Sequence, residues 1–439
     1  MQNSHGANDL ASLTRENLRL RKAVEELSIL NEIATAINST GSLDKIVSLI
    51  VQKCVKFLKV EQAAVMLLDE QEQDKGFHTM VRKADTSASF LPFRLDTHLT
   101  GWMLKYQKPL LVTNLCEDDR FTGLIEKDCP IKSLLSVPLI FKGNMIGLLT
   151  AFNQKSPEGF TAESQRLLSI IATQSSQVIQ NARLLEKEKE LVRVREEMRM
   201  AYEIQVNLLP KSAPEIPGYD IAGKSIPAKF VGGDYFDFIP IGDNQLAFCL
   251  GDVTGKGMPA ALLMSHIQAT IHSQVISAPQ PRECMRNTNT IIYQNTGMGK
   301  FITMYYGILD FTNHRIVYCN AGHDFPFFFE NPNENPNSIS RLEKGGLVLG
   351  FVPEFQYAQE EISVAPGSLL VLYSDGIPEA KNQQDEEFGE ERLEAVLRES
   401  LDLPSQKLVD TIIEAVEQHA GDTPQSDDIT LVVIRRLKN

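Results

Sequence analysis

The sequence predicts an α+β protein with two domains joined by a charged helical segment. Short apolar runs of strand length alternate with stretches of helical periodicity in residues 32–182 and again in 211–439. Residues 183–210 between them are rich in charge and carry a helical repeat, and prolines follow closely at Pro210, Pro214 and Pro217. A length of 439 residues suits two or three folding units.

Composition and charge exclude several classes of protein. The formal net charge is −14, so we expect no nucleic-acid binding and no docking on anionic lipid. The polar start, MQNSHGANDLASLTREN, has no apolar signal core, and no run of 18 apolar residues occurs. We therefore expect a cytoplasmic protein without a membrane span. Six cysteines lack C-x-x-C spacing, which predicts reduced and mostly buried thiols.

Residues 1–31 are predicted to form a coiled-coil helix. Two sets of positions recur at seven-residue steps: Leu10, Asn17, Val24 and Asn31, and Leu13, Leu20 and Leu27. Leucine at one set, with valine and asparagine at the other, is typical of a parallel two-stranded coiled coil. A single amphipathic helix packed on its own domain would give the same pattern.

Residues 32–182 are predicted to form the first α+β domain. Helical periodicity covers 43–58, and strand-like runs cover 63–68, 134–141 and 145–152. A short hairpin turn at Lys142-Gly143-Asn144 joins the last two runs. A long helix is expected to begin after Thr161, which can cap it.

Residues 183–210 are predicted to form a second coiled coil. Its apolar positions are Leu184, Leu191, Val194, Met198, Ala201 and Leu208. Lys187 and Gln205 interrupt this seam, so we expect a marginally stable homodimer that a signal from the first domain could shift. We expect the linker to act on a helix at 260–275. A passive spacer is the alternative.

Residues 211–439 are predicted to form a sandwich of strands and helices. The expected strands are 235–239, 245–250, 303–309, 315–318, 369–373 and 429–435. The expected helices are 260–275, 281–295, 390–399 and 405–419.

Aspartates stand at the ends of several of these strands, most of them beside glycine. They are Asp234, Asp252, Asp375 and the pair Asp427-Asp428. Each alone is typical of a turn, but together they predict a shared site at the rim of a sheet. Clustered carboxylates repel each other, and two divalent cations would neutralise them. Ligands that are all oxygen favour Mg²⁺ or Mn²⁺, and such a pair of ions can activate water for attack on phosphate.

Five sequence blocks resemble the signature of PPM-type (type 2C) protein phosphatases, in the branch of SpoIIE and RsbU. They are Gly-Gly-Asp-Tyr-Phe-Asp (232–237), Gly-Asp-Val-Thr-Gly-Lys-Gly-Met-Pro-Ala-Ala-Leu (251–262), Asn-Ala-Gly-His (320–323), Tyr-Ser-Asp-Gly-Ile-Pro-Glu-Ala (373–380) and Asp-Asp-Ile-Thr-Leu (427–431). They occur in the family's order. The resemblance implies an α-β-β-α sandwich with two Mn²⁺ or Mg²⁺ ions in its cleft.

The resemblance also implies roles for individual residues. Asp252 would bridge the two metal ions, and the carbonyl of Val253 would be a ligand. Asp375 and Asp427 would ligate as well, with Asp428 as the alternative to Asp427, and Asp234 would join directly or through water.

The sequence departs from the family pattern near the bridging aspartate. Many members have a histidine there that can serve as general acid, whereas this chain has Thr254 and Lys256. His323 is the nearest candidate for an acid, although a structural histidine fits equally. Lys229 could meet the phosphate, or it could be an ordinary surface lysine.

Residues 27–182 resemble a GAF domain. The motifs are Ser-Val-Pro-Leu-Ile (136–140), Gly-Asn-Met-Ile-Gly-Leu-Leu (143–149) and Phe-Thr-Ala-Glu (160–163). The resemblance implies a six-stranded antiparallel sheet with a small-molecule pocket. The acidic residues of the cyclic-nucleotide version are missing, so the ligand is unknown.

Together these patterns predict a metal-dependent serine/threonine protein phosphatase that a GAF domain regulates. The resemblance implies a phosphorylated STAS-domain anti-anti-sigma factor as its substrate, in a bacterial partner-switching pathway. Two alternatives are a GAF-regulated nucleotide cyclase, because Gly-Gly-Asp-Tyr-Phe (232–236) resembles GGDEF, and an inactive phosphatase-fold adaptor. The cyclase leaves the other aspartate blocks unexplained.

Overall fold

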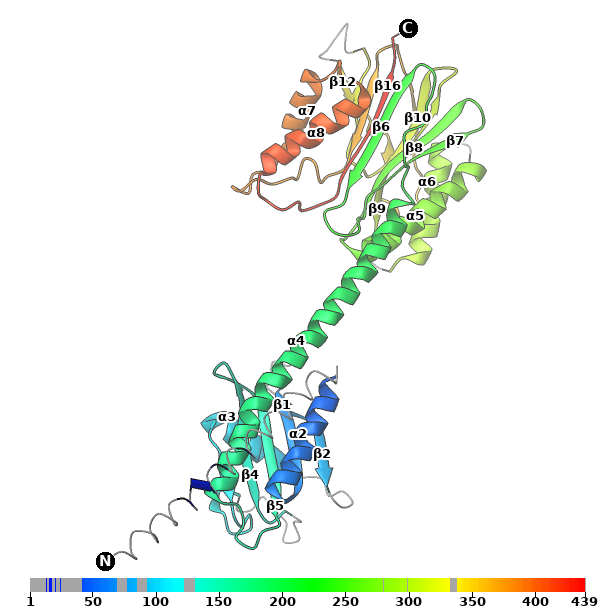
Figure 1. Ribbon diagram of the computed structural model, residues 1–439. Coiled ribbons are helices and arrows are strands. Elements are labelled where there is room, and N and C mark those ends of the chain that lie inside the picture. Colours follow the sequence, from blue (N-terminus) through cyan, green and yellow to red (C-terminus); the bar gives the residue numbers. More distant parts are fainter. Residues whose placement is uncertain are drawn as a thin grey trace, which may run out of the picture. The chain divides into compact units, whose positions relative to one another are not determined.

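The computed structural model divides the chain into two compact units, Met1–Arg193 and Val194–Asn439 (Figure 1). It describes residues 42–68, 77–84, 93–121, 131–278, 280–297, 299–331 and 338–438, with five single residues between 13 and 24. Among those five, Leu13, Leu20 and Val24 are helical and exposed. The rest of the predicted coiled coil at 1–31 lies outside the described residues.

The first unit is built on an antiparallel sheet, in which the described residues form five strands against the six that the resemblance implies. The strand order is β2-β1-β5-β4-β3. The bounds are β1 Val60–Leu68, β2 Phe77–Ala84, β3 Leu110–Val112, β4 Leu134–Phe141 and β5 Asn144–Gln154, with a 3-10 turn at Asp119–Phe121. The predicted hairpin is confirmed, because Lys142 and Gly143 both have positive φ (49° and 84°), as a two-residue hairpin turn requires.

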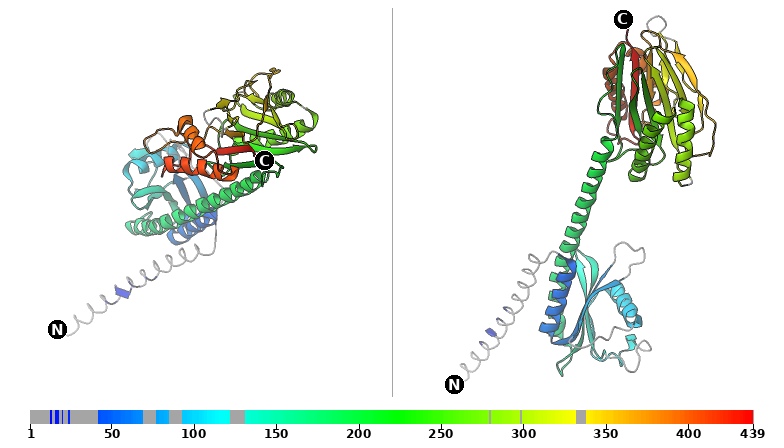
Figure 2. Two further views of the ribbon diagram at one scale, coloured as in Figure 1. Left: turned by 90° about the horizontal axis from the view of Figure 1, so that it is seen from above. Right: turned by 90° about the vertical axis from the view of Figure 1, so that its right-hand side faces the viewer.

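Helices cover both faces of this sheet (Figure 2). On one face, α2 (Leu43–Leu58) and the first part of α4 (Ala162–Val206) share a core with β1, β4 and β5. On the other face, α3 (Phe93–Tyr106) contributes Leu99 and Met103 to a second core. The predicted helix start is confirmed, since Thr161 Oγ1 accepts a hydrogen bond from Ser164 N.

The second unit consists of two sheets packed face to face. The strand order of the first sheet is β13-β10-β9-β8-β7, with β14 beside β10, and that of the second sheet is β12-β11-β15-β16-β6. All pairs are antiparallel except the two-residue pair of β10 and β13. The bounds are β6 Tyr219–Ile226, β7 Tyr235–Ile241, β8 Gln245–Val253, β9 Ile302–Asp310, β10 Arg315–Ala321, β11 Phe327–Phe329, β12 Ile339–Arg341, β13 Gly345–Gly346, β14 Glu360–Ser363, β15 Leu369–Tyr373 and β16 Ile429–Arg436.

Two pairs of helices cover the outer faces of the sandwich (Figure 1). The pair α5 (Met258–Ser277) and α6 (Pro281–Asn295) packs on the first sheet. The pair α7 (Gly389–Glu399) and α8 (Ser405–Ala420) packs on the second. A third core, rich in aromatic side chains, fills the space between the sheets. The predicted α-β-β-α sandwich is therefore confirmed.

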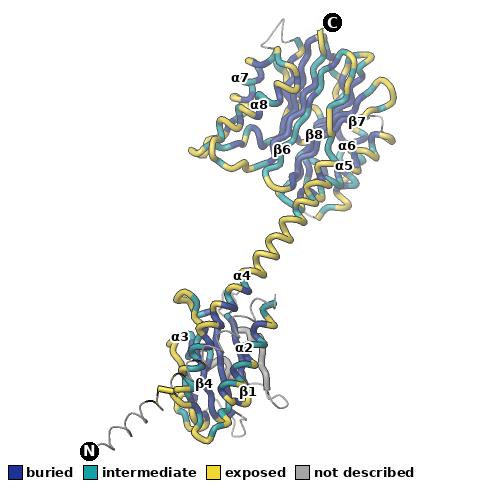
Figure 3. The backbone as a smooth tube through the Cα atoms, viewed as in Figure 1, coloured by how far each residue is buried: buried dark blue, intermediate teal, exposed yellow. Residues whose placement is uncertain are grey.

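The segment between the domains is part of a single helix. Helix α4 begins at Ala162, well before the predicted linker, and ends at Val206, before Pro210. Residues 184–197 are all exposed, on every side of the helix (Figure 3). None of the helices in the described ranges is long and apolar enough to cross a membrane.

Candidate metal centre

The first sheet brings two predicted aspartates to one edge. Asp234 directly precedes β7, and Asp252 is the penultimate residue of β8. The two strands are antiparallel and Tyr235 pairs with Gly251, so the start of one strand lies beside the end of the other. Asp234 is 4% exposed.

The second sheet brings the other aspartates to its own edge in the same way. Asp375 follows β15, and Asp427 and Asp428 precede β16. Tyr373 pairs with Leu431 in this antiparallel pair. Ser374 links the end of β15 to the start of β16, because its Oγ donates to Asp428 O at 3.0 Å and accepts from Thr430 N at 2.9 Å.

The two edges meet, and the carboxylates raise one another's pKa. Burial, followed by the charges of Asp375 and Asp427, raises the pKa of Asp252 to about 7. Burial and Asp427 raise the pKa of Asp375 to about 6. Burial and Asp252 raise the pKa of Asp234 well above its usual range. Four acids from two sheets therefore form one electrostatic cluster.

Asp428 differs from its neighbour Asp427 because both of its carboxylate oxygens accept hydrogen bonds from backbone amides, whereas Asp427 Oδ1 accepts one, from Asp428 N. Asp428 Oδ1 accepts from Ala228 N at 2.8 Å, and Asp428 Oδ2 accepts from Gly233 N and Asp234 N. A Cβ at Gly232 would lie 2.5 Å from Asp428 Oδ2, so only glycine permits this approach. Asp428 therefore holds the loop that carries Asp234.

Lys256 is a neighbour of the cluster whose contacts the sequence did not reveal. Its Nζ lies 2.6 Å from Asp427 Oδ2 and donates to Ser426 O at 2.7 Å. The hydrogen bond to Asp427 raises the pKa of Lys256. The glycines on either side, Gly255 and Gly257, have φ of 100° and 78° and turn the chain sharply here. From the sequence, Lys256 was noted only as one of the residues that stand where many family members have a histidine; its contact with Asp427 was not predicted.

His323 bonds to Thr303, which pairs with Asp252 in the sheet, but the imidazole itself is buried. It is 4% exposed, its Nδ1 lies 2.9 Å from Thr303 Oγ1, and its Nε2 has no partner. Burial lowers the pKa of His323 to about 4, so the imidazole is neutral at pH 7. A buried neutral imidazole fits the structural alternative better than a proton donor. Lys229 is exposed.

The donor set fits hard divalent cations. Every donor is oxygen, which suits Mg²⁺ or Mn²⁺. Asp234 Oδ2 is buried without a hydrogen-bond partner, as an atom awaiting a ligand would be. Across the described residues, no three His, Cys, Asp or Glu side chains converge into a ready-made ion cage. Mg²⁺ typically keeps several waters and takes only one or two carboxylates, so the open arrangement remains compatible.

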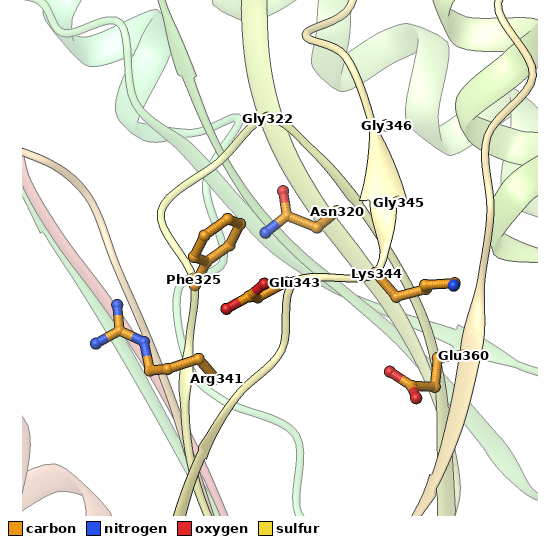
Figure 4. A pocket seen from close by; sticks show the side chains of 9 residues that line it. All are labelled: Asn320, Gly322, Phe325, Arg341, Glu343, Lys344, Gly345, Gly346 and Glu360. Atoms are coloured by element: carbon orange, nitrogen blue, oxygen red, sulfur yellow. The ribbon is translucent and has the colours of Figure 1, made fainter.

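A cavity of about 560 Å³ lies beside the turn that carries His323, and its lining in the described residues does not include the predicted metal aspartates (Figure 4). Arg341 and Lys344 point to opposite sides of Glu343 in this view, and Glu360 lies beside Lys344. Two positive and two negative side chains balance, so this cavity offers no excess positive charge for a phosphate group.

Two protein families match the two units. The family described as Stage II sporulation protein E (SpoIIE) matches residues 242–437, and the GAF domain family matches residues 40–180. Both matches agree with the resemblances that the motifs indicated.

Among individual relatives, the phosphoserine phosphatase RsbU of Bacillus subtilis is 32% identical over 244 residues, which cover 55% of this chain and 71% of RsbU. Protein IcfG of Synechocystis is 28% identical over 55% of this chain, but only 41% of IcfG is covered. The solved SiaA-PP2C domain of Pseudomonas aeruginosa is 20% identical, with a TM-score of 0.49 over 56% of this chain and 98% of that domain.

Proposed function

The chain belongs to the SpoIIE family of PP2C-type serine/threonine phosphatases and carries a GAF domain, and from this premise we propose that it dephosphorylates a partner protein with two Mn²⁺ or Mg²⁺ ions. The observation that carries the proposal is the cluster of four carboxylates from two sheets, in which burial and neighbouring acids raise the pKa values of Asp234, Asp252 and Asp375. Buried acids in such a cluster are typical of a site built for cations.

We assign the residue roles as follows. Asp252 interacts with Asp375, Asp427 and Asp234 and would hold both ions, with these three acids as further ligands. The carbonyl of Val253 would be a further ligand. Asp427 is preferred to Asp428, because the oxygens of Asp428 already accept three backbone hydrogen bonds. When bound, the ions would neutralise the phosphoryl oxygens and lower the pKa of the attacking water.

The buried thiols of the described residues are poor nucleophiles, whereas Cys116, in the first unit, is exposed. Burial raises the pKa of Cys54, Cys284 and Cys319 to about 12, and that of Cys249 well above its usual range. Since the thiolate is the reactive form, these cysteines are inert at neutral pH. We therefore propose direct attack by water without a phosphoenzyme.

The test combines metal removal with isotope labelling. Hydrolysis of a phosphoserine peptide should stop with chelator and return with Mn²⁺ or Mg²⁺. In ¹⁸O-water, each released phosphate should carry one labelled oxygen, because water attacks phosphorus. Acid quenching during turnover should trap no phosphoenzyme, and this absence separates direct attack from a covalent intermediate.

Three outcomes would contradict this proposal. Full turnover in chelator would remove the metal role, and a trapped phosphocysteine or phosphohistidine would remove direct attack. Metal binding without hydrolysis of any phosphopeptide would favour an inactive phosphatase-fold adaptor. If the protein also made a cyclic dinucleotide from GTP, it would be a nucleotide cyclase.

The partner we propose is a phosphorylated STAS-domain anti-anti-sigma factor. The likeness to RsbU, which is named a phosphoserine phosphatase, supports a phosphoserine substrate. The STAS class follows only from the family resemblance. Incubating a lysate with the protein and Mn²⁺, and identifying the phosphoprotein that loses its phosphate, tests this assignment.

We also propose that exposed apolar side chains of α4 pair with a second copy of the chain. Leu184 is 52% exposed, Leu191 71% and Val194 39%, and they recur at helical spacing. Such a seam on a helix gains stability mainly by burying these side chains against a partner. The GAF state would then act on the phosphatase through the packing of this helix.

Insertions in α4 test this coupling. One to four residues inserted after Arg195 rotate all that follows by about 100° per residue. We expect activity to vary with the phase of the insertion, and sedimentation to report a dimer that Leu191→Glu dissociates. Equal rates for all four insertions, with a monomeric parent protein, would show that α4 is a passive spacer.

A further inference from the structure

We propose that Gln205 is a positioning residue of the metal centre: its side-chain amide ties the last turn of α4 to the loop that carries Asp234. The inference rests on the proposed function. Gln205 Nε2 donates to Gly232 O at 2.7 Å, and Gly232 N donates to Gln205 Oε1 at 3.0 Å. The amide group and the glycine backbone thus close a ring of two hydrogen bonds, two residues before Asp234.

The burial of Gln205 corrects its predicted place in the dimer seam. Its neighbours Ile204 and Val206 are exposed, whereas Gln205 is only 7% exposed and lies within its own unit. A buried amide without partners is costly, so the two hydrogen bonds to Gly232 specify where this turn docks. Heptad spacing could not distinguish these positions.

The loop of residues 228–234 is held by two side chains that come from far apart in the sequence. Asp428 binds the amides of Ala228, Gly233 and Asp234, and Gln205 binds both backbone groups of Gly232. The Asp234 carboxyl also interacts with the side chains of Ser374 and Thr430, but its backbone belongs to this loop. Gln205 therefore contributes to the position of the Asp234 carboxylate through the loop backbone.

A cavity borders this contact and leaves the loop room to move. Its volume is about 480 Å³, and its lining includes Gln205, Val206, Gly232, Asp234 and Phe236. Because hydrogen bonds weaken steeply beyond about 3.5 Å, a shift of the last turn by about 1 Å would break both bonds. Helix α4 is continuous from Ala162 to Val206, so a displacement of this helix would reach Asp234 directly through Gln205, in addition to the expected route through α5.

The experiment uses the full chain and three variants. Gln205→Met keeps the length of the side chain but removes both hydrogen bonds, and Gln205→Asn keeps the amide but is too short to reach. Asn207→Ala is the matched control, because Asn207 lies just after α4 and its amide donates to Glu203 O in the last turn of that helix, with no bond to the loop among the described residues. Mn²⁺ binding is measured by calorimetry, activity is measured against Mn²⁺ concentration, and hydrogen exchange is followed at Gly232 and Gly233.

We expect both Gln205 variants to need roughly tenfold more Mn²⁺ for half-occupancy, as the loss of one to two net hydrogen bonds implies. Activity at saturating Mn²⁺ should stay within about threefold of wild type, exchange at Gly232 should accelerate, and Asn207→Ala should match wild type. Unchanged Mn²⁺ affinity in both variants would overturn the inference, even if their melting temperatures fell. Mn²⁺ binding is measured without turnover. If the protein bound Mn²⁺ but hydrolysed no phosphopeptide, the proposed function would be refuted, and the binding data would still test the role of Gln205.

Discussion

Replacing Asp252 with asparagine should abolish phosphatase activity and, in the absence of metal, stabilise the fold. We expect kcat to fall by at least about 10³-fold, because Asp252 interacts with each of the other acids and no remaining group would hold both ions. Removing one of several repelling charges should raise the free energy of unfolding of the metal-free protein by ~2 kcal/mol, which is a melting temperature several degrees higher.

The pH dependence of this effect follows from the raised pKa values. The acids titrate near 3.8 when unfolded, whereas the pKa is about 7 for Asp252 and about 6 for Asp375 in the fold. Their contribution to stability is complete below pH 4 and is lost as the pH rises through 6 to 7. The gain from Asp252→Asn should therefore be larger at pH 8 than at pH 5, as urea unfolding in chelator would measure.

The control for this substitution is Asp410→Asn. Asp410 forms a surface ion pair with Lys224 at 3.2 Å, so its loss should change stability by less than about 1 kcal/mol and leave activity intact. An Asp252→Asn protein that hydrolyses phosphopeptide at the wild-type rate would refute the site assignment. One that is destabilised in chelator would refute the electrostatic account.

Replacing Asp428 with alanine should have the opposite effect on stability. Three backbone N–H groups, those of Ala228, Gly233 and Asp234, would lose their acceptor. We expect a loss of roughly 3–5 kcal/mol in the free energy of unfolding, because buried donors would be left unpaired around a broken charge-assisted network. Thermal unfolding with and without Mn²⁺ measures this loss.

Asp427→Ala is the matched comparison, one residue away. Asp427 is partly exposed and pairs with Lys256, so its removal should cost about 1 kcal/mol or less in stability while still lowering activity strongly. If the two variants lost equal stability, Asp428 would not be the residue that holds the loop. Together the two substitutions separate a metal ligand from a structural carboxylate.

The sequence by itself determined the elements and the acids. Strong periodicity placed helices 43–58 and 281–295 and strands 134–141 and 369–373 at their observed bounds. These segments are long, or they are bounded by turn residues, so the hydrophobic pattern and the turn residues indicate the same bounds. Strands β11 to β14 were not predicted from the sequence, because segments of two to four residues are too short to show a period, and the eight-residue edge strand β6 was also missed.

Only the tertiary structure decided which acids do what. Asp427 and Asp428 are adjacent in sequence and identical in chemistry, yet one faces Lys256 and the other faces backbone amides. Gln205 fits a heptad in sequence but is buried against Gly232, 27 residues away. Side-chain direction at a strand end or a helix end depends on what packs there. Partners that lie far apart along the chain leave no local pattern, so their pairing is settled only when the two sheets and α4 come together.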